Sequence, residues 1–201
     1  MLHLTAQELE DKLARHKIWI SSVLDTEPKG EYLGLGDVSL TGRELKDKRL
    51  SYSYISSCDL GKSSFIQCAM DSISLINCKM DYFNTTNSSY ERSRFFHVEA
   101  LSSTMRECKL DKSTIDSSNF SFCSFYKVSF VESKLERSKF LDCTFVEADF
   151  RGASLDSVDL KGTQFTGGDL SIVSAKGCCI KKVKFPTPRD RIRFLMLGAW
   201  E

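Results

Sequence analysis

The side chains best suited to chemistry in this chain of 201 residues are eight cysteines and three histidines. Thiolates and imidazoles act as nucleophiles, redox centres and metal ligands when they converge at suitable spacings. Here His3, His16 and His97 are widely separated, and the adjacent Cys178 and Cys179 lack the spacing of a redox motif. No glycine-rich loop follows a strand to open a helix, and the aspartates do not gather into a metal-binding loop. We therefore expect no catalytic residue, no cofactor, no metal site and no enzymatic activity.

The apolar residues follow a period of five. An apolar residue stands at every residue number divisible by five from Leu35 to Phe185 except one, Thr85, among 31 such positions. A helix would spread these side chains around its axis, and a flat strand would alternate them between two faces. A chain that turns a corner every five residues keeps them on one axis, and its coils can pair through strand-like hydrogen bonds.

The position two residues before each apolar centre is mostly Ser, Cys or Ala, which indicates a second inward position beside a large side chain. Seven of the eight cysteines occupy it. We expect buried structural thiols, because two sulfurs in parallel orientation suit neither a disulfide nor a zinc site with four ligands. The seven cysteines are Cys58, Cys68, Cys78, Cys108, Cys123, Cys143 and Cys178.

The clearest repeats run from Ala148-Asp149-Phe150-Arg151-Gly152 to Val158-Asp159-Leu160. This pattern resembles the pentapeptide-repeat family, whose consensus is a small residue, Asp or Asn, Leu or Phe, and two variable residues. The resemblance covers about residues 35–185. It implies an all-β solenoid, a right-handed quadrilateral β-helix with four repeats, or twenty residues, in each coil.

Two regions depart from that consensus. Phe83, Thr85 and Val98 suggest irregular coils over residues 81–100, and Arg43 and Lys48 at inward positions suggest a first coil with a distorted or outward-turned backbone.

The ends of a solenoid need caps, and short helices are expected at both. Residues 1–34 form an N-terminal helix and linker, 35–185 the solenoid and 186–201 a C-terminal helix. Thr5 and Glu8 form a capping box that predicts a helix over 6–20, and residues 25–36, with Pro28, form the linker. A short helix before the repeats also resembles many bacterial members of the family.

The second helix is predicted after Thr187-Pro188. Its apolar residues fall on two sides, so that one side can close the solenoid and the other can meet a second copy. Ile192, Leu195, Met196 and Ala199 make one stripe. The residues off that stripe are the hypothetical homodimer contact: Phe194, Leu197 and Trp200.

Outward positions carry one apolar strip along successive coils, and such strips often mark interaction surfaces. An alternative of equal weight is that local irregularity buries some of these side chains. The hypothetical partner-binding residues are Tyr82, Leu101, Phe122, Leu141, Tyr126 and Val146.

The formal charge is +1, from 28 Lys plus Arg and 27 Asp plus Glu, so no general attraction to polyanions is expected. The longest apolar run is too short for a bilayer span, and acidic residues stand where a signal peptide would be apolar. We expect a cytoplasmic protein with no membrane or nucleic-acid partner. A basic C-terminal cluster allows phosphate contact or a solvated end, and we favour the second: Lys176, Lys181, Lys182, Lys184, Arg189, Arg191 and Arg193.

The leading functional hypothesis is a non-enzymatic module whose rigid rod presents side chains to an unidentified protein partner. The resemblance also implies an alternative, topoisomerase (DNA gyrase) binding by imitation of duplex DNA, known for the quinolone-resistance branch. That mechanism needs a negative rod, whereas residues 45–185 hold 20 Lys plus Arg and 17 Asp plus Glu. A further alternative is an effector that a bacterium delivers into a host cell.

Overall fold

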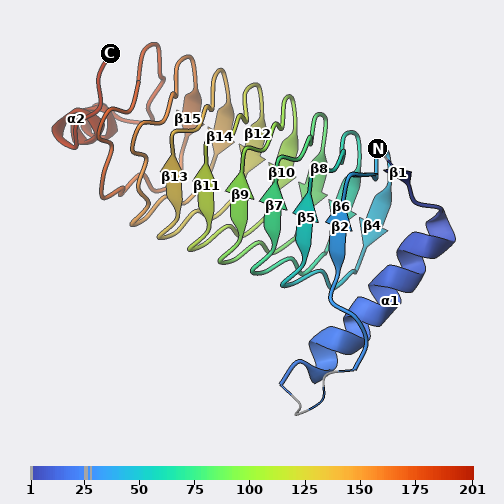
Figure 1. Ribbon diagram of the computed structural model, residues 1–201. Coiled ribbons are helices and arrows are strands. Elements are labelled where there is room, and N and C mark those ends of the chain that lie inside the picture. Colours follow the sequence, from blue (N-terminus) through green and yellow to red (C-terminus); the bar gives the residue numbers. More distant parts are fainter. Residues whose placement is uncertain (1, 25–26, 28) are drawn as a thin grey trace.

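The computed structural model describes residues 2–24, 27 and 29–201. The chain winds into a rod of stacked coils with a helix near each end (Figure 1). The predicted linker over 25–36 is described only in part, since residues 25, 26 and 28, and with them Pro28, lie outside the described residues.

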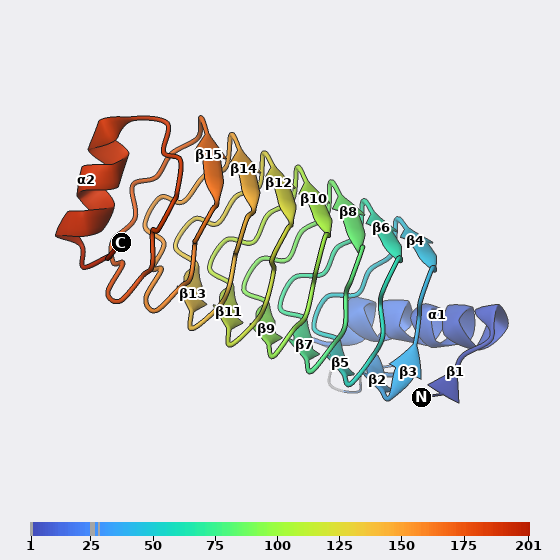
Figure 2. The ribbon, with the colours of Figure 1, turned by 90° about the horizontal axis from the view of Figure 1, so that it is seen from above.

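Short parallel strands line two sides of the rod. One sheet has the order β15-β14-β12-β10-β8-β6-β4, the other has the order β13-β11-β9-β7-β5-β2, and β1 pairs with β3 (Figure 2). The strands are β1 (Leu2–His3), β2 (Gly34–Gly36), β3 (Val38–Ser39), β4 (Glu44–Lys46), β5 (Tyr54–Ser56), β6 (Ser64–Ile66), β7 (Ser74–Ile76), β8 (Asn84–Thr86), β9 (Arg94–Phe96), β10 (Thr104–Arg106), β11 (Thr114–Asp116), β12 (Ser124–Tyr126), β13 (Lys134–Glu136), β14 (Thr144–Val146) and β15 (Gln164–Thr166).

The pairing register in both long sheets is twenty residues. Leu35 lies opposite Ile55, and Phe125 lies opposite Phe145. The remaining two sides of the rod are joined by isolated parallel bridges with the same offset, such as Asn119 with Lys139. The prediction of a solenoid with twenty residues per coil is therefore confirmed, and the rod has about seven turns.

Most corners of a coil have a residue with left-handed backbone two positions after the apolar centre. The φ angle is 58° at Tyr82 and 61° at Phe122, while Gly152 and Gly162 take the same place with φ of 69° and 75°. A left-handed backbone costs a residue with a side chain about 1–2 kcal/mol. Interior packing and hydrogen bonds between coils must therefore hold these corners.

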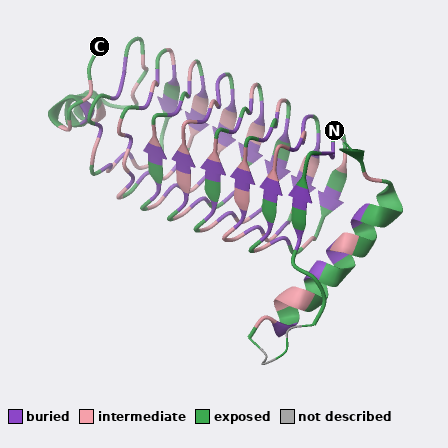
Figure 3. Cartoon of the chain, in the orientation of Figure 1, coloured by how far each residue is buried: buried purple, intermediate pink, exposed green. Residues whose placement is uncertain are grey.

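The interior is filled by the five-residue series of apolar side chains, which appear as regularly spaced buried segments in Figure 3. The predicted phenylalanine columns are present. Phe125 stacks on Phe145 with ring centroids 4.6 Å apart, and Phe145 stacks on Phe165 at 5.0 Å. Phe130 stacks on Phe150 in a neighbouring column at 4.8 Å. Offset stacking adds to the stability that burial alone provides.

The coils over residues 81–100 are regular, so the expected irregularity is wrong. Thr85 is small for a centre, and Phe83 at the neighbouring inward position fills the space, with its ring 5.0 Å from that of Phe65. The Thr85 hydroxyl is not left without a partner, because the Tyr90 hydroxyl donates to it at 2.9 Å. A large and a small residue have exchanged places without changing the backbone.

The first coil is also regular, contrary to the expectation from Arg43 and Lys48. Both side chains leave the interior and reach the N-terminal segment. Arg43 Nη2 donates to the Leu4 carbonyl at 2.8 Å, and Lys48 Nζ lies 2.8 Å from Glu10 Oε2. These cations connect the first coil to its cap.

Helix α1 (Ala6–Ser22) lies against the first coils, and its capping box of Thr5 and Glu8 is confirmed. Its buried residues include Leu9, Leu13 and His16. His16 is fully buried, and its Nε2 lies 3.1 Å from the Ser51 carbonyl oxygen. The Ser51 carbonyl has no preceding coil with which to pair, and the imidazole supplies its hydrogen-bond partner instead.

Helix α2 (Pro188–Met196) lies across the C-terminal end of the rod, with Thr187 as N-cap (Figure 2). Phe194 is fully buried, with its ring 5.0 Å from that of Phe185, and Leu197 packs against the core. The assignment of Phe194 as a dimer contact is therefore wrong, because its side chain closes the solenoid, whereas the assignment of the half-buried Leu197 stays a prediction. Only Trp200 of that set is exposed.

Candidate interaction surfaces

The small inward residues form a polar network between coils. Ser103 Oγ accepts the Phe83 N–H at 3.0 Å and donates to the Met80 carbonyl at 2.6 Å. Cys123 Sγ takes the same role one coil later, accepting the Ser103 N–H at 3.3 Å and donating to the Ala100 carbonyl at 2.7 Å. Buried backbone groups need such partners, which explains Ser and Cys where Ala is usual.

All eight cysteines are free and buried. Burial raises the pKa of Cys78 to about 11, and it raises the pKa values of Cys123 and Cys178 to about 12. A thiol must lose its proton to act as a nucleophile or as a metal ligand. These groups stay protonated at neutral pH, which agrees with the expected structural role.

Several outward carboxylates also hold coils together. Asp111 Oδ1 accepts the Val131 N–H at 3.1 Å, and Asp156 Oδ1 accepts the Lys176 N–H at 2.9 Å. Each bond joins an aspartate to the coil that follows it. Within the described ranges, no group of three or more His, Cys, Asp or Glu side chains could hold a metal ion.

Four of the six residues predicted for partner binding share one corner of the rod, and we call them the corner strip: Tyr82, Leu101, Phe122 and Leu141. The Tyr82 N–H donates to the Leu101 carbonyl and the Phe122 N–H donates to the Leu141 carbonyl, both at 2.8 Å. Tyr82 is 58% exposed and Phe122 is 62% exposed, while both leucines are half-buried.

The aromatic residues of the corner strip stand in alternate coils, with Ser102 between them. Two coils correspond to about 10 Å at the usual spacing of paired strands. The strip is therefore a discontinuous row of apolar side chains along four coils.

Tyr126 and Val146 form a second pair on β12 and β14, at the far end of these strands from the corner strip. The Arg106 guanidinium lies over the Tyr126 ring at 4.6 Å, and Lys127 Nζ lies 5.3 Å from the same ring. Both apolar side chains are half-buried. Because cations already cover Tyr126, it is less available to a partner than Phe122.

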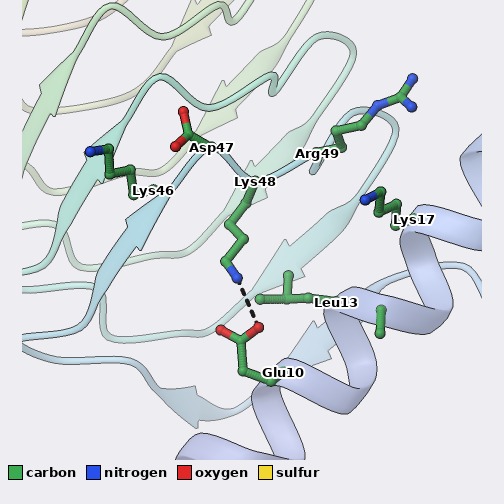
Figure 4. A pocket seen from close by; sticks show the side chains of 8 residues that line it. Glu10, Leu13, Lys17, Lys46, Asp47, Lys48 and Arg49 are labelled. Atoms are coloured by element: carbon green, nitrogen blue, oxygen red, sulfur yellow. Dashed lines mark hydrogen bonds and ion pairs between the residues drawn. The ribbon is translucent and has the colours of Figure 1, made fainter.

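The structure adds a feature that sequence patterns did not indicate, a groove between α1 and the first coil (Figure 4). Its volume is about 340 Å³. Glu10 pairs with Lys48, so Lys17, Lys46 and Arg49 supply most of the remaining positive charge. Leu13, Ala14 and Asp47 complete the lining. The groove brings together residues far apart in sequence, so the five-residue pattern carries no signal of it.

Other exposed aromatic residues near the first coils are Tyr52 and Tyr54, at 52% and 41% exposure. Both occupy outward positions of the five-residue repeat, with Tyr52 on the corner opposite the corner strip, so the register itself could have indicated them. No helix in the described part of the chain is long and apolar enough to cross a bilayer.

The geometry defines a class of protein: a parallel β-solenoid made of five-residue repeats. A scan of family profiles identifies pentapeptide repeats in eight copies, with residues 142–171 matched. The chain belongs to the pentapeptide-repeat family.

The chain is also similar to several solved structures. QnrB1, a plasmid-mediated fluoroquinolone resistance protein, has 17% identity and a TM-score of 0.38, over 82% of this chain and 95% of QnrB1. HetL from the cyanobacterium Nostoc sp., involved in heterocyst differentiation regulation, has 13% identity and a TM-score of 0.34, over 90% and 95%. A pentapeptide repeat protein from the Arabidopsis thaliana thylakoid lumen has 17% identity and a TM-score of 0.42, over 60% and 70%. No curated protein matches the sequence significantly.

Proposed function

We propose that this protein is a non-enzymatic interaction module that binds a protein partner through the corner strip. The observation that carries the proposal is the exposure of Tyr82 and Phe122 at left-handed corner positions. Ser102 occupies the same corner between them with a φ of 54°, so the fold accepts a small polar residue there. The corner therefore does not require the large side chains of Tyr82 and Phe122.

The neighbouring leucines extend this surface. Leu101 lies in the coil after Tyr82, and Leu141 lies in the coil after Phe122. Ser121 occupies the same position in the coil between the two leucines, so a small polar residue fits there as well. Exposed aromatic residues are enriched in the energetic centres of protein interfaces. The proposed partner is a protein with an apolar surface that can contact several successive coils.

Rigidity favours such binding. The backbone of each residue of the corner strip is hydrogen-bonded to a neighbouring coil, and the interior beneath Phe122 contains stacked phenylalanine rings. A preorganised surface loses less conformational entropy when it binds.

The experiment compares the protein with a variant carrying Phe122→Ser and Leu141→Ser, used as bait in affinity purification from the native cell. Serine already occupies both kinds of position in this corner, so the variant is expected to fold. We expect the wild type to retain a protein that the variant recovers at least tenfold less. Circular dichroism and thermal unfolding verify the fold of the variant.

The chain offers a matched control on the opposite corner. Lys112→Ser with Val131→Ser places the two changes with the same nineteen-residue offset. Lys112 is left-handed with a φ of 58°, as Phe122 is at 61°. The control should retain the partner in full. Equal recovery by the wild type and the corner-strip variant would reject this surface.

A further inference from the structure

Helix α2 presents an unexpected face to solvent. The sequence allowed either apolar side of the helix to close the solenoid. The stripe that contains Ile192, Leu195 and Met196 points outward, with exposures of 54%, 39% and 82%. Phe194, on the other side of the helix, is the residue that enters the core. Figure 3 shows the outer side of α2 as exposed.

Arginines flank this outward stripe. At 100° per residue, Arg191 falls beside Leu195 on one side, while Arg189 and Arg193 fall beyond Met196 on the other. Contacts support this order, since Arg189, Ile192, Arg193 and Met196 line one open groove together with Ile172 and Leu197. The apolar face thus has a cationic edge at Arg189 and Arg193, while Arg191 on the other edge is paired with Glu201.

The last coil adds more positive charge. From residue 176 to the end the chain has seven Lys and Arg against two Asp and Glu, whereas residues 1–175 have 21 against 25. Lys181 and Lys182 are exposed and follow Ile180, whose N–H donates to the Trp200 carbonyl at 2.8 Å. Trp200 is 53% exposed at the same end. The formal charge of +1 is therefore the sum of a cationic C-terminal end and an acidic remainder of the chain.

We propose that this C-terminal end docks on the surface of an anionic lipid bilayer. This end of the rod exposes Ile, Leu, Met and Trp side chains together with Arg and Lys, which is the composition of segments that lie in a membrane interface. The nine-residue helix is too short to span a bilayer, so it lies in the plane of the headgroups. The expectation of no membrane partner rested on the total charge and on the absence of a bilayer-spanning segment, whereas a segment that lies in the interface needs only a local apolar face with cations beside it.

Two other occupants fit the face less well. A second copy in a twofold dimer would bring the two cationic ends together, and like charges across an interface oppose association. Duplex nucleic acid would pair with the cations but would leave Ile192 and Met196 without an apolar partner.

The test is co-sedimentation of the whole protein with vesicles of 70% phosphatidylcholine and 30% phosphatidylserine, with pure phosphatidylcholine vesicles for comparison. We expect binding to the anionic vesicles only, reduced at least tenfold by Ile192→Gln with Met196→Gln. Lys181→Gln with Lys182→Gln should weaken binding several-fold. Tyr52→Gln with Tyr54→Gln, which also removes two exposed apolar side chains but at the other end of the rod, is the matched control and should bind as the wild type does.

Some outcomes would overturn the proposal. These are no binding to the anionic vesicles, or binding that Ile192→Gln with Met196→Gln leaves unchanged. Binding to a 30-base-pair duplex without vesicle binding would assign the end to nucleic acid. A dimer in light scattering that the same pair of changes dissociates, again without vesicle binding, would assign it to a second copy.

Discussion

The Nδ1 atom of His16 accepts a hydrogen bond from the backbone N–H of Leu33 at 3.0 Å. The other ring nitrogen therefore carries the proton, and it faces the Ser51 carbonyl and the Ser53 hydroxyl, each at 3.1 Å. In later coils, the carbonyl and hydroxyl groups at the corresponding positions accept hydrogen bonds from backbone N–H groups of the preceding coil. The Asp71 carbonyl accepts from the Tyr52 N–H, and Ser93 Oγ accepts from the Ile73 N–H. One neutral imidazole thus completes the first coil.

This role of His16 predicts a loss of stability in mild acid. Burial lowers the pKa of His16 below the ordinary value of about 6.5, so the unfolded chain binds a proton more readily than the native one. The contribution of this group is complete above about pH 6.5 and declines as the pH falls below it. Urea unfolding at pH 7.5 and 5.5 should show a lower midpoint at pH 5.5.

The variant His16→Gln tests the origin of that loss. It cannot be protonated, so its midpoint should depend less on pH over the same range, although it should be lower than that of the wild type at pH 7.5. Equal pH dependence in the two proteins would contradict the role assigned to His16.

The pair of Thr85 and Tyr90 predicts a non-additive effect on stability. Thr85→Val leaves the buried Tyr90 hydroxyl without its acceptor and should cost about 1–3 kcal/mol. Adding Tyr90→Phe removes the unpaired group and should recover part of that loss. Chemical denaturation of both single variants and the double variant gives the coupling energy, and strictly additive effects would contradict this hydrogen bond.

The phenylalanine columns predict different costs at the centre and at the end of the rod. Phe145 is fully buried between two stacked rings, so Phe145→Ala should cost about 3–5 kcal/mol. Phe185 is only half-buried, so Phe185→Ala should cost less. Thermal unfolding of the two variants checks this order, and a larger loss at Phe185 would be inconsistent with it.

The buried thiols predict slow chemical labelling. A thiol reagent at pH 8 should modify the folded protein slowly and should modify all eight cysteines rapidly in guanidinium, because burial in the folded state excludes the reagent and raises the pKa of thiols such as Cys123. Rapid modification of several cysteines in the folded state would show that they are accessible.

The solenoid could be predicted from the sequence because every coil repeats the same inward pair of positions. That register placed Phe145 on Phe165 and placed the cysteines inside. It failed at Thr85, where a fixed pattern does not show that Phe83 can exchange size with its neighbour.

The ends of the rod were less predictable. The two apolar sides of α2 look alike in sequence, and only packing on Phe185 decides that Phe194 faces inward. The groove beside α1 depends on how the helix lies against Lys46 and Arg49, which the repeat does not specify. Of the predicted partner-binding residues, those of the corner strip share one edge because they fall at two adjacent positions of the twenty-residue coil, whereas Tyr126 lies apart beneath Arg106.

The most direct measurement is the distance between spin labels attached to cysteines introduced at Lys62, Phe122 and Lys182. These positions share one corner, and the unreactive native thiols leave the introduced ones selectively labelled. Stacked coils predict about 14 Å from 62 to 122 and about 29 Å from 62 to 182, a doubling for twice the number of coils. Two distances that do not increase in proportion to the number of coils would contradict the twenty-residue solenoid.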